Sequence, residues 1–256
     1  MTRRLFALVS LTVAAGLFAG CANQMAPPAS PNILRVGVTP NSPPMISKSG
    51  GQMVGLEADL ARALAAEMGR EVVFVERSWD QLLPSVNAGQ VDIVMSNMTI
   101  TNERRIQADF TDSYLQVGQM IMVRSGDYNL FRDPQIIAML DTRIGVEPGT
   151  VSDAFVQRYC QRATPVAVKG PEHAVDQLVK NRIDVFIHDA PVIWNQSSMA
   201  ASRGVSMVPK PIGSEYLGWA VQRGNNEMRN AANAALAKWR KNGQLARMVN
   251  RWVPTN

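Results

Sequence analysis

The stretch SWDQLLPSVNAGQVDIVMSNMTITNERR, residues 78–105, joins a short helical segment to an apolar run and then to a polar turn with two arginines. Its middle part, VDIVMS (91–96), is apolar without the alternation of a half-exposed strand, so it predicts a strand buried on both faces. The turn that follows offers hydroxyl and amide groups, and Arg104 lies three residues beyond Thr101. Because a guanidinium pairs in a bidentate way with a carboxylate, this combination indicates a receptor for a small anion.

Strand-like runs alternate with helical segments along the rest of the chain. The other runs typical of strands are ILRVGV (33–38), EVVFVE (71–76), GQMIMVRSG (118–126), RIGVE (143–147), TPVAVK (164–169), IDVFIH (183–188) and YLGWAVQR (216–223). Helical segments are expected at 56–69, at 79–89 with an interruption at Pro84, and over one long stretch at 228–252. This alternation predicts an α/β protein with mostly parallel sheets flanked by helices.

Two extended segments divide the chain into two lobes. Residues 118–126 lead into a second series of strands and helices, and VSMVPKPIG (205–213) leads back out of it. Two extended crossings between lobes form a natural hinge. We therefore expect lobe 1 to comprise residues 33–123 and 213–256, and lobe 2 to comprise residues 124–212.

The composition is typical of a globular protein and argues against a nucleic-acid-binding function. The 256 residues are 46% hydrophobic and 18% charged, and the formal net charge is +5. Without Arg3 and Arg4 the balance is 24 basic to 21 acidic residues, or +3, which is too weak for a nucleic-acid-binding surface. We expect no nucleic-acid partner, no metal site and no cofactor.

The N-terminus has the pattern of an export signal. Arg3 and Arg4 form a short basic region, and residues 5–19 are apolar but too short to span a bilayer comfortably. This pattern predicts a signal peptide over residues 1–20. The mature protein is therefore expected in the periplasm or on the extracytoplasmic face of the membrane.

Small residues before the first cysteine suggest a lipid anchor. Ala19 and Gly20 precede Cys21 as in a bacterial lipobox, although Phe18 stands where leucine is usual. Lipidation of Cys21 would hold the protein at a membrane through two acyl chains, and residues 21–32 would form a flexible tether rich in Pro, Ala and Ser. The alternative is ordinary secretory cleavage nearby, with Cys21 incidental.

The motifs together resemble a known family. Six segments occur in order and at the right spacing: LRVGVTPNSPPM, GLEADLARALAAEMG, SWDQLLPSVNAGQVDIVMSNMTITNERR, DFTDSYLQVGQMIMVR, IGVEPGT and RIDVFIHDAP. They resemble the bacterial periplasmic amino-acid-binding proteins, the family 3 solute-binding proteins of ABC importers, over residues 33–253. The resemblance implies a two-lobed type II periplasmic-binding-protein fold that closes on its ligand. It also implies a monomer that delivers a small zwitterion, most plausibly an amino acid, to an ABC permease in the inner membrane.

The resemblance assigns the two ends of an α-amino acid to two charged residues. Arg104 matches the family's arginine for the ligand carboxylate, and Asp189 in FIHDAP matches its aspartate for the ligand ammonium. Each residue also has a structural alternative. Arg104 could form a surface pair with Glu103 or Asp109, and Asp189 could cap a helix that has Pro191 in its first turn.

Two turns complete the head-group contacts that the resemblance implies. The first turn would use backbone groups of Ser96 and Met98 and the hydroxyl of Thr99, although these residues could instead form a helix N-cap region. The second turn would close over the carboxylate with Gly149, Thr150 and Val151. Free amides at a helix N-terminus attract anions, which supports the second assignment.

The pocket for the ligand side chain departs from the family pattern. The loop after the first strand often carries two aromatic residues in the family, but here it reads SPPM (42–45). Ser42 is therefore expected to line the pocket, with Trp79 as a flat apolar wall or, alternatively, as part of the lobe 1 core. Glu147 could favour a cationic or polar group. The sequence leaves the identity of the ligand side chain open.

A second hypothesis places an enzyme on the same scaffold. The family resembles periplasmic cyclohexadienyl dehydratases, which act on prephenate or arogenate and need a general acid. Glu215 or Glu147 would be the candidate acid. Because no paired carboxylates or Ser-His-Asp arrangement can be placed in the cleft from the sequence, we expect a binding protein without catalytic residues.

Overall fold

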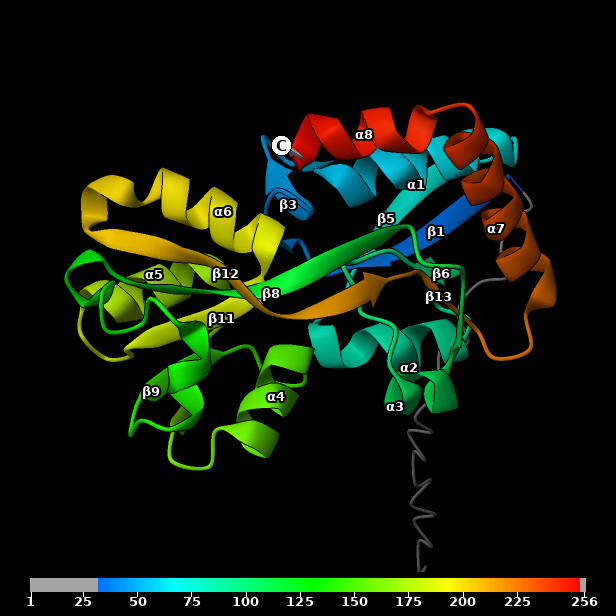
Figure 1. The fold of residues 1–256 in the computed structure, drawn as a ribbon. Helices are drawn as coiled ribbons and strands as arrows, with labels where there is room; N and C mark the ends of the chain where they lie inside the picture. The colour runs from blue at the N-terminus through cyan, green and yellow to red at the C-terminus, as the bar shows by residue number, and fades with distance from the viewer. Residues whose placement is uncertain (1–31, 254–256) are drawn as a thin grey trace, which may run out of the picture.

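The protein consists of two α/β lobes joined by long strands (Figure 1). The computed structural model describes residues 32–253. The predicted signal peptide and Cys21, with the tether up to residue 31, lie outside the described residues. The two-lobed α/β architecture confirms the fold class predicted from the sequence.

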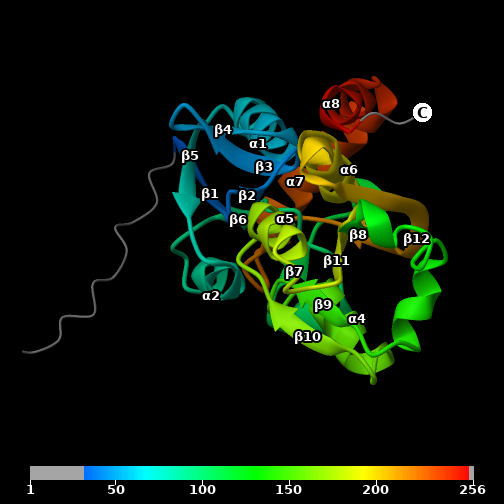
Figure 2. The same cartoon turned by 90° about the vertical axis from the view of Figure 1, so that its left-hand side faces the viewer.

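Lobe 1 is built on a five-stranded sheet in the order β5-β1-β6-β13-β7. Its strands are β1 (Ile33–Val38), β5 (Glu71–Glu76), β6 (Ile93–Val94), β7 (Asp109–Phe110) and β13 (Ala220–Val221). β1 pairs in parallel with β5 and β6, whereas β13 runs antiparallel to β6 and β7. A small second sheet beside α1 contains β2 (Asn41–Ser42), β3 (Ile46–Ser49) and β4 (Gln52–Val54) (Figure 2).

Lobe 2 repeats this arrangement with the order β10-β9-β11-β8-β12. Its strands are β8 (Leu115–Arg124), β9 (Arg143–Val146), β10 (Thr164–Ala167), β11 (Val185–Asp189) and β12 (Val205–Leu217). β9 pairs in parallel with β10 and β11, and β8 runs antiparallel to β11 and β12. Each sheet is therefore mixed rather than mostly parallel, because one strand in each, β13 in lobe 1 and β8 in lobe 2, runs against the direction of the other strands.

The long strands β8 and β12 run side by side between the two lobes (Figure 1). Their register shifts between Val208 and Gly213, which is the pattern of a β-bulge. They are the two extended crossings expected from the sequence. The boundaries placed at residues 123/124 and 212/213 remain a prediction.

Helices cover the faces of both sheets. Lobe 1 carries α1 (Leu56–Glu67), a 3₁₀ turn (Trp79–Gln81), α2 (Leu82–Asn87), α3 (Asn102–Gln107), α7 (Asn226–Lys241) and α8 (Gln244–Trp252). Lobe 2 carries α4 (Val151–Tyr159), α5 (Pro171–Val179) and α6 (Ala190–Met199), with 3₁₀ turns at Ser125–Asp127, Pro134–Ala138 and Ala201–Arg203. α8 lies against α1 on the outside of lobe 1 (Figure 1).

Three predicted elements differ from the structure. Pro84 does not interrupt a helix; it lies in the first turn of α2, where a backbone N–H has no partner within the helix. The long helix predicted at 228–252 is two helices, because Gly243 takes a left-handed conformation with φ 71°. The strand predicted at 216–223 is divided between the end of β12 and β13, with Gly218 at the break.

The central strands of lobe 2 are buried on both faces, as their unbroken apolar sequences predict. Met120 and Met122 of β8 belong to one hydrophobic cluster, while Ile121 and Val123 belong to the cluster on the opposite face of the sheet. Successive side chains of a strand point to opposite faces, so both faces must be apolar when helices cover each of them.

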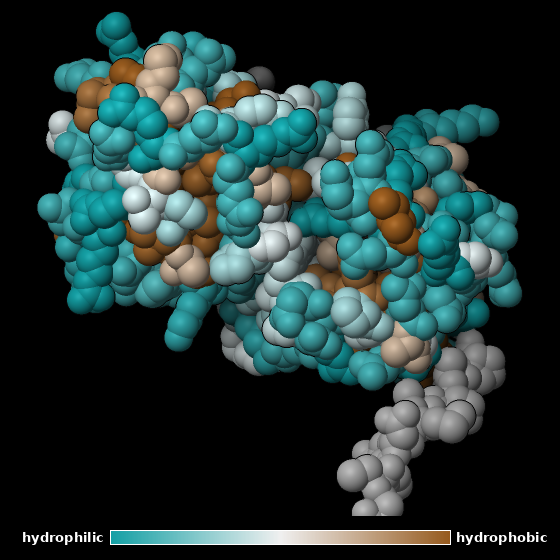
Figure 3. Space-filling model, turned by 90° about the horizontal axis from the view of Figure 1, so that it is seen from below, coloured by the Kyte–Doolittle hydropathy of each residue, from teal (hydrophilic) through white to brown (hydrophobic). Residues whose placement is uncertain are grey.

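One face of the molecule is mainly hydrophilic. Figure 3 shows a mainly hydrophilic surface on which hydrophobic side chains form separate patches. Within residues 32–253, no helix has the length and apolar character needed to cross a membrane. Cys160 is a buried free thiol, as expected from the absence of a second cysteine in the described part of the chain.

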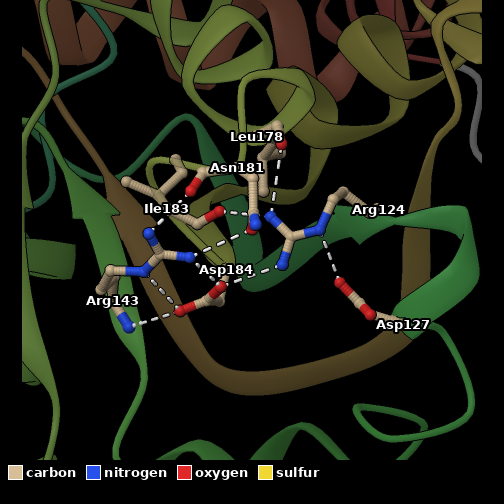
Figure 4. Close-up of polar contacts among 7 residues, drawn as sticks. All are labelled: Arg124, Asp127, Arg143, Leu178, Asn181, Ile183 and Asp184. Atoms are coloured by element: carbon tan, nitrogen blue, oxygen red, sulfur yellow. Dashed lines mark hydrogen bonds and ion pairs between the residues drawn. The ribbon is translucent and has the colours of Figure 1, made fainter.

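An ionic network fixes the end of lobe 2 that carries the start of β9 and the end of β8 (Figure 4). Asp184, just before β11, accepts hydrogen bonds from the Arg143 backbone N–H and guanidinium and from Arg124 Nη2. Arg124 also pairs with Asp127 at 2.7 Å. The hydrogen bonds from Arg143 hold the pKa of Asp184 well below its usual range. Asp184 therefore ties three strand ends together.

We expect Asp184→Asn to destabilise the protein by about 1–2 kcal/mol, because it weakens charge-assisted bonds that are partly screened by solvent. Urea unfolding at pH 7 measures this change. Asp141→Asn is the matched control, since Asp141 pairs with Arg162 on the exposed surface and its loss should hardly move the midpoint. Equal midpoints for the Asp184 variant and the wild type would show that the network does not support lobe 2. Because the pKa of Asp184 is depressed, its contribution should also fade as the pH falls below the ordinary aspartate range.

Candidate functional site

A cavity lies between the lobes. Its lining residues are Thr39, Asn41, Ser42, Trp79, Ser96, Asn97, Thr99 and Arg104 from lobe 1, and Glu147, Thr150, Val151, Ser152, His188 and Asp189 from lobe 2. Most of them follow the carboxyl ends of β1, β6, β9 and β11. This is the edge of an α/β sheet at which ligands generally bind.

Arg104 is buried, with 9% of its surface exposed, and it reaches across to lobe 2. Its Nη1 donates to the Thr99 carbonyl at 2.8 Å and its Nη2 donates to the Gly149 carbonyl at 3.2 Å. The guanidinium lies 5.1 Å from the ring centre of Trp79, a cation–π contact. Burial lowers the pKa of Arg104 from its ordinary value, but an arginine remains charged. The alternative of a surface pair with Glu103 or Asp109 does not fit this geometry.

Asp189 is the N-cap residue of α6 by position, yet its side chain does not cap the helix. Instead Asp189 Oδ2 accepts a hydrogen bond from Asn97 Nδ2 of lobe 1 at 2.7 Å. The residue is 5% exposed, and burial raises the pKa of its carboxyl group against the opposing effects of His188 and Arg104. The structure therefore places this carboxylate in the cavity, as predicted.

Two further carboxylates converge on the site. Glu215 of β12 accepts a hydrogen bond from the Thr99 hydroxyl at 2.6 Å, and burial together with Asp189 raises its pKa to about 7. Glu147 Oε2 accepts from Asn41 Nδ2 at 2.9 Å, and Glu147 Oε1 lies 3.2 Å from His188 Nε2. The sequence could not place paired carboxylates in the cleft, but the fold brings these acidic groups together from distant parts of the chain.

Eight of the ten predicted ligand-binding residues line the cavity. They are Ser42, Trp79, Ser96, Thr99, Arg104, Thr150, Val151 and Asp189. Met98 does not, because its side chain packs in the lobe 1 core and its carbonyl accepts from the Gly218 N–H. Gly149 also lies outside this lining, and its N–H is already bonded to Asp153. The Thr150 hydroxyl caps α4 by accepting from the Asp153 N–H.

The cavity wall also includes Glu147, which the sequence named as a residue that could favour a cationic or polar group, and five residues that were not predicted: Thr39, Asn41, Asn97, Ser152 and His188. Asn97 has a positive φ of 57°, a conformation that asparagine tolerates better than most residues. An asparagine directly after a predicted buried strand is therefore the sequence feature that could have indicated this turn. His188 precedes Asp189 directly in the chain, but a single histidine carries no sequence pattern that would mark it as a binding residue. Among residues 32–253 no cluster of three potential metal ligands is found.

Comparison with protein families decides the class of the molecule. The family model for bacterial extracellular solute-binding proteins, family 3, matches residues 34–255. The chain belongs to this family. The resemblance inferred from the six sequence segments is thereby confirmed.

Relatives of this solute-binding protein support the same conclusion. It is 27% identical over 244 residues to the histidine-binding periplasmic protein of Salmonella typhimurium, and 88% of each chain is covered. The solved structure of an ancestral arginine-binding protein bound to arginine has a TM-score of 0.81 at 29% identity, covering 87% of this chain and 98% of the other. The solved structure of an ancestral amino acid-binding protein, a precursor of cyclohexadienyl dehydratase, has a TM-score of 0.79 at 32% identity. The match covers 86% of this chain and 95% of the other.

A fully buried carboxyl group supports the binding turn of this solute-binding protein from behind. Glu57 accepts hydrogen bonds from the Asn97 N–H at 2.7 Å, the Tyr114 hydroxyl at 2.7 Å and Trp219 Nε1 at 3.0 Å. Burial raises its pKa to about 7, although these three donors favour the charged form. Glu57 therefore holds the backbone of Asn97, whose side chain reaches Asp189.

We expect Glu57 to make the stability of the solute-binding protein depend on pH. Its pKa of about 7 in the folded state exceeds the ordinary value of 4.5, so the folded state holds the proton more tightly. The stabilisation that comes from this proton should be fully present below pH 4.5 and lost as the pH rises through 7. The free energy of unfolding should fall by about 3 kcal/mol at most over this range. Thermal melting of the wild type and Glu57→Gln between pH 4 and pH 8, about the range set by these pKa values, measures it.

The variant should show a flatter dependence on pH than the wild type over this window. Glu71→Gln is the control, because Glu71 is exposed on the edge strand β5 and should leave the wild-type curve unchanged. If Glu57→Gln follows the same curve as the wild type, Glu57 does not titrate between these values.

Proposed function

We propose that this chain captures an α-amino acid in the cavity between its lobes and delivers it to an ABC importer. The observation that carries the proposal is the position of Arg104 and Asp189 on the wall of one cavity, each contributed by a different lobe. A guanidinium suits the ligand's carboxylate and a carboxylate suits its ammonium. The family and the histidine- and arginine-binding relatives support the same class of ligand.

Closure of the lobes would be coupled to binding. Contacts between the lobes already surround the cavity: Trp79 Nε1 donates to the Gly149 carbonyl at 3.1 Å, and Asn97 and Asn41 donate to Asp189 and Glu147. A ligand held by both lobes stabilises the closed arrangement more than the open one, which is the requirement for a ligand-driven change of population. The paired crossing strands β8 and β12 would serve as the hinge.

The setting of this activity is part of the proposal. The predicted signal peptide and the acylated Cys21 would place a monomer on the extracytoplasmic face, tethered near a permease of the inner membrane. The relatives named above are periplasmic or amino-acid-binding proteins, which supports that location. We assign no catalytic role to any residue.

We expect Arg104→Ala to weaken amino-acid binding by about ten- to a hundredfold, since a charge-assisted pair would be lost. Asp189→Asn should act in the same direction through the ligand's ammonium. Isothermal titration calorimetry with the common amino acids measures both effects. Arg105→Ala is the matched control, because Arg105 is the exposed neighbour on α3 and should retain wild-type affinity.

Two results would contradict the proposal. One is the absence of binding heat with every amino acid tested on protein that has been freed of carried-over ligand. The other is an Arg104→Ala protein that is folded by circular dichroism and binds as tightly as the wild type.

A dehydratase is the alternative that a specific observation favours. Glu215 has a pKa raised to about 7 by burial and by Asp189, which suits a general acid, and one structural relative is a precursor of cyclohexadienyl dehydratase. We expect no conversion when the protein is incubated with prephenate. The absorbance of phenylpyruvate measures the conversion. If the wild type converts prephenate and Glu215→Gln does not, the protein is a dehydratase and the transport proposal is wrong.

A further inference from the structure

We propose that the ligand is an amino acid with a positively charged side chain, and that Glu147 is the residue that selects it. This inference rests on the proposed function, because it concerns the other end of the same ligand. It is argued from the charges, the unpaired atoms and the fixed side-chain orientations of the cavity wall.

The cavity holds more acidic than basic groups. Arg104 and Asp189 balance each other, and they would balance the two charges of any α-amino acid head group. Glu147 then remains on the cavity wall as a further acidic group. A buried carboxylate needs a compensating partner. A cationic side chain supplies that partner, whereas a neutral or acidic side chain does not.

Two buried acceptor atoms of the cavity wall receive no hydrogen bond within the described part of the chain: Glu147 Oε1 and Asn97 Oδ1. The orientation of Asn97 is fixed, because its Nδ2 donates to the Asp189 carboxylate, which can only accept while it is ionised. Asn97 is 7% exposed, so bulk water scarcely reaches it. The ligand must therefore bring N–H donors to this wall.

The neighbours of Glu147 leave one of its oxygens available. Asn41 is held by Ser42, whose hydroxyl donates to Asn41 Oδ1 at 2.9 Å, so Asn41 Nδ2 is turned toward Glu147 Oε2. His188 Nε2 lies 3.2 Å from the other oxygen, Oε1, but without the alignment of a hydrogen bond. Oε1 is the atom to which a donor of the ligand would bind.

His188 does not supply the missing positive charge. Burial opposes its charged form, while Glu147, Asp189 and Glu215 raise the pKa of the imidazole overall. Its Nδ1, however, accepts the Asp189 N–H at 2.7 Å and so has no room for a second proton in this arrangement. While Nδ1 accepts this hydrogen bond, the ring carries its single proton on Nε2 beside Glu147, so in this arrangement the imidazole gives Glu147 no full positive charge.

The test compares two ligands of nearly equal shape. Arginine carries a guanidinium where citrulline carries a neutral urea group, so the ratio of their dissociation constants isolates the side-chain charge. Isothermal titration calorimetry on the purified protein should give arginine an advantage over citrulline of about ten- to a hundredfold. Lysine and histidine, each against glutamine and leucine, extend the comparison to other cations.

Glu147→Gln should reduce the arginine advantage to about threefold or less, because the side chain keeps its shape and loses its charge. Glu172→Gln is the control, since Glu172 is an exposed glutamate on α5 of the same lobe and should leave the ratio unchanged. The comparison of ligands on the wild type stands by itself if Glu147→Gln does not fold.

The possible outcomes distinguish failure of this inference from failure of the proposed function. Wild-type protein that binds citrulline, glutamine or leucine as tightly as arginine overturns the cationic ligand and leaves amino-acid binding in place. An arginine advantage that survives unchanged in folded Glu147→Gln overturns the role of Glu147. Failure of every amino acid to bind overturns the proposed function itself.

Discussion

The closed cavity depends on the burial of one guanidinium and several carboxyl groups away from bulk water. Removing such charges from water is costly unless partners compensate them. Arg104 finds the Thr99 carbonyl in its own lobe and the Gly149 carbonyl in the other, with the ring of Trp79 beside it. Because these partners come from two lobes, the charge is best compensated when the lobes are together. Recognition and closure are therefore physically linked.

The rigid ends of strands keep these groups in position. In the turn after β6, Asn97 takes a left-handed backbone conformation with φ 57°. The backbone N–H of Asn97 donates to the buried carboxyl group of Glu57. Glu57 is itself fixed by Tyr114 and Trp219 in the core of lobe 1. The side chain of Asn97 then reaches Asp189 at the end of β11. A site supported in this way from behind retains its geometry better than one carried by free loops.

The strands that join the lobes also take part in the site. Gly118 of β8 lies so close to β12 that a Cβ atom there would meet the Pro211 side chain at 2.8 Å. Past the register shift, β12 carries Glu215 to the Thr99 hydroxyl of lobe 1. The connection between the lobes therefore bears a carboxyl group that is bonded to lobe 1, and any hinge motion would move this group.

Local sequence determined most of the secondary structure and several of the residues that line the cavity. The runs 33–38 and 71–76 coincide with β1 and β5, although β5 is an edge strand whose side chains are exposed or half-buried. The resemblance to the family pointed to Arg104 and Asp189. Only the tertiary structure decided that Asn41 and His188 flank Glu147 on the wall of one cavity, that Glu215 reaches Thr99, and that the sheets are mixed. The reason is physical: strand propensity depends on neighbours along the chain, whereas the field that a buried charge experiences depends on groups that folding brings from distant parts of it.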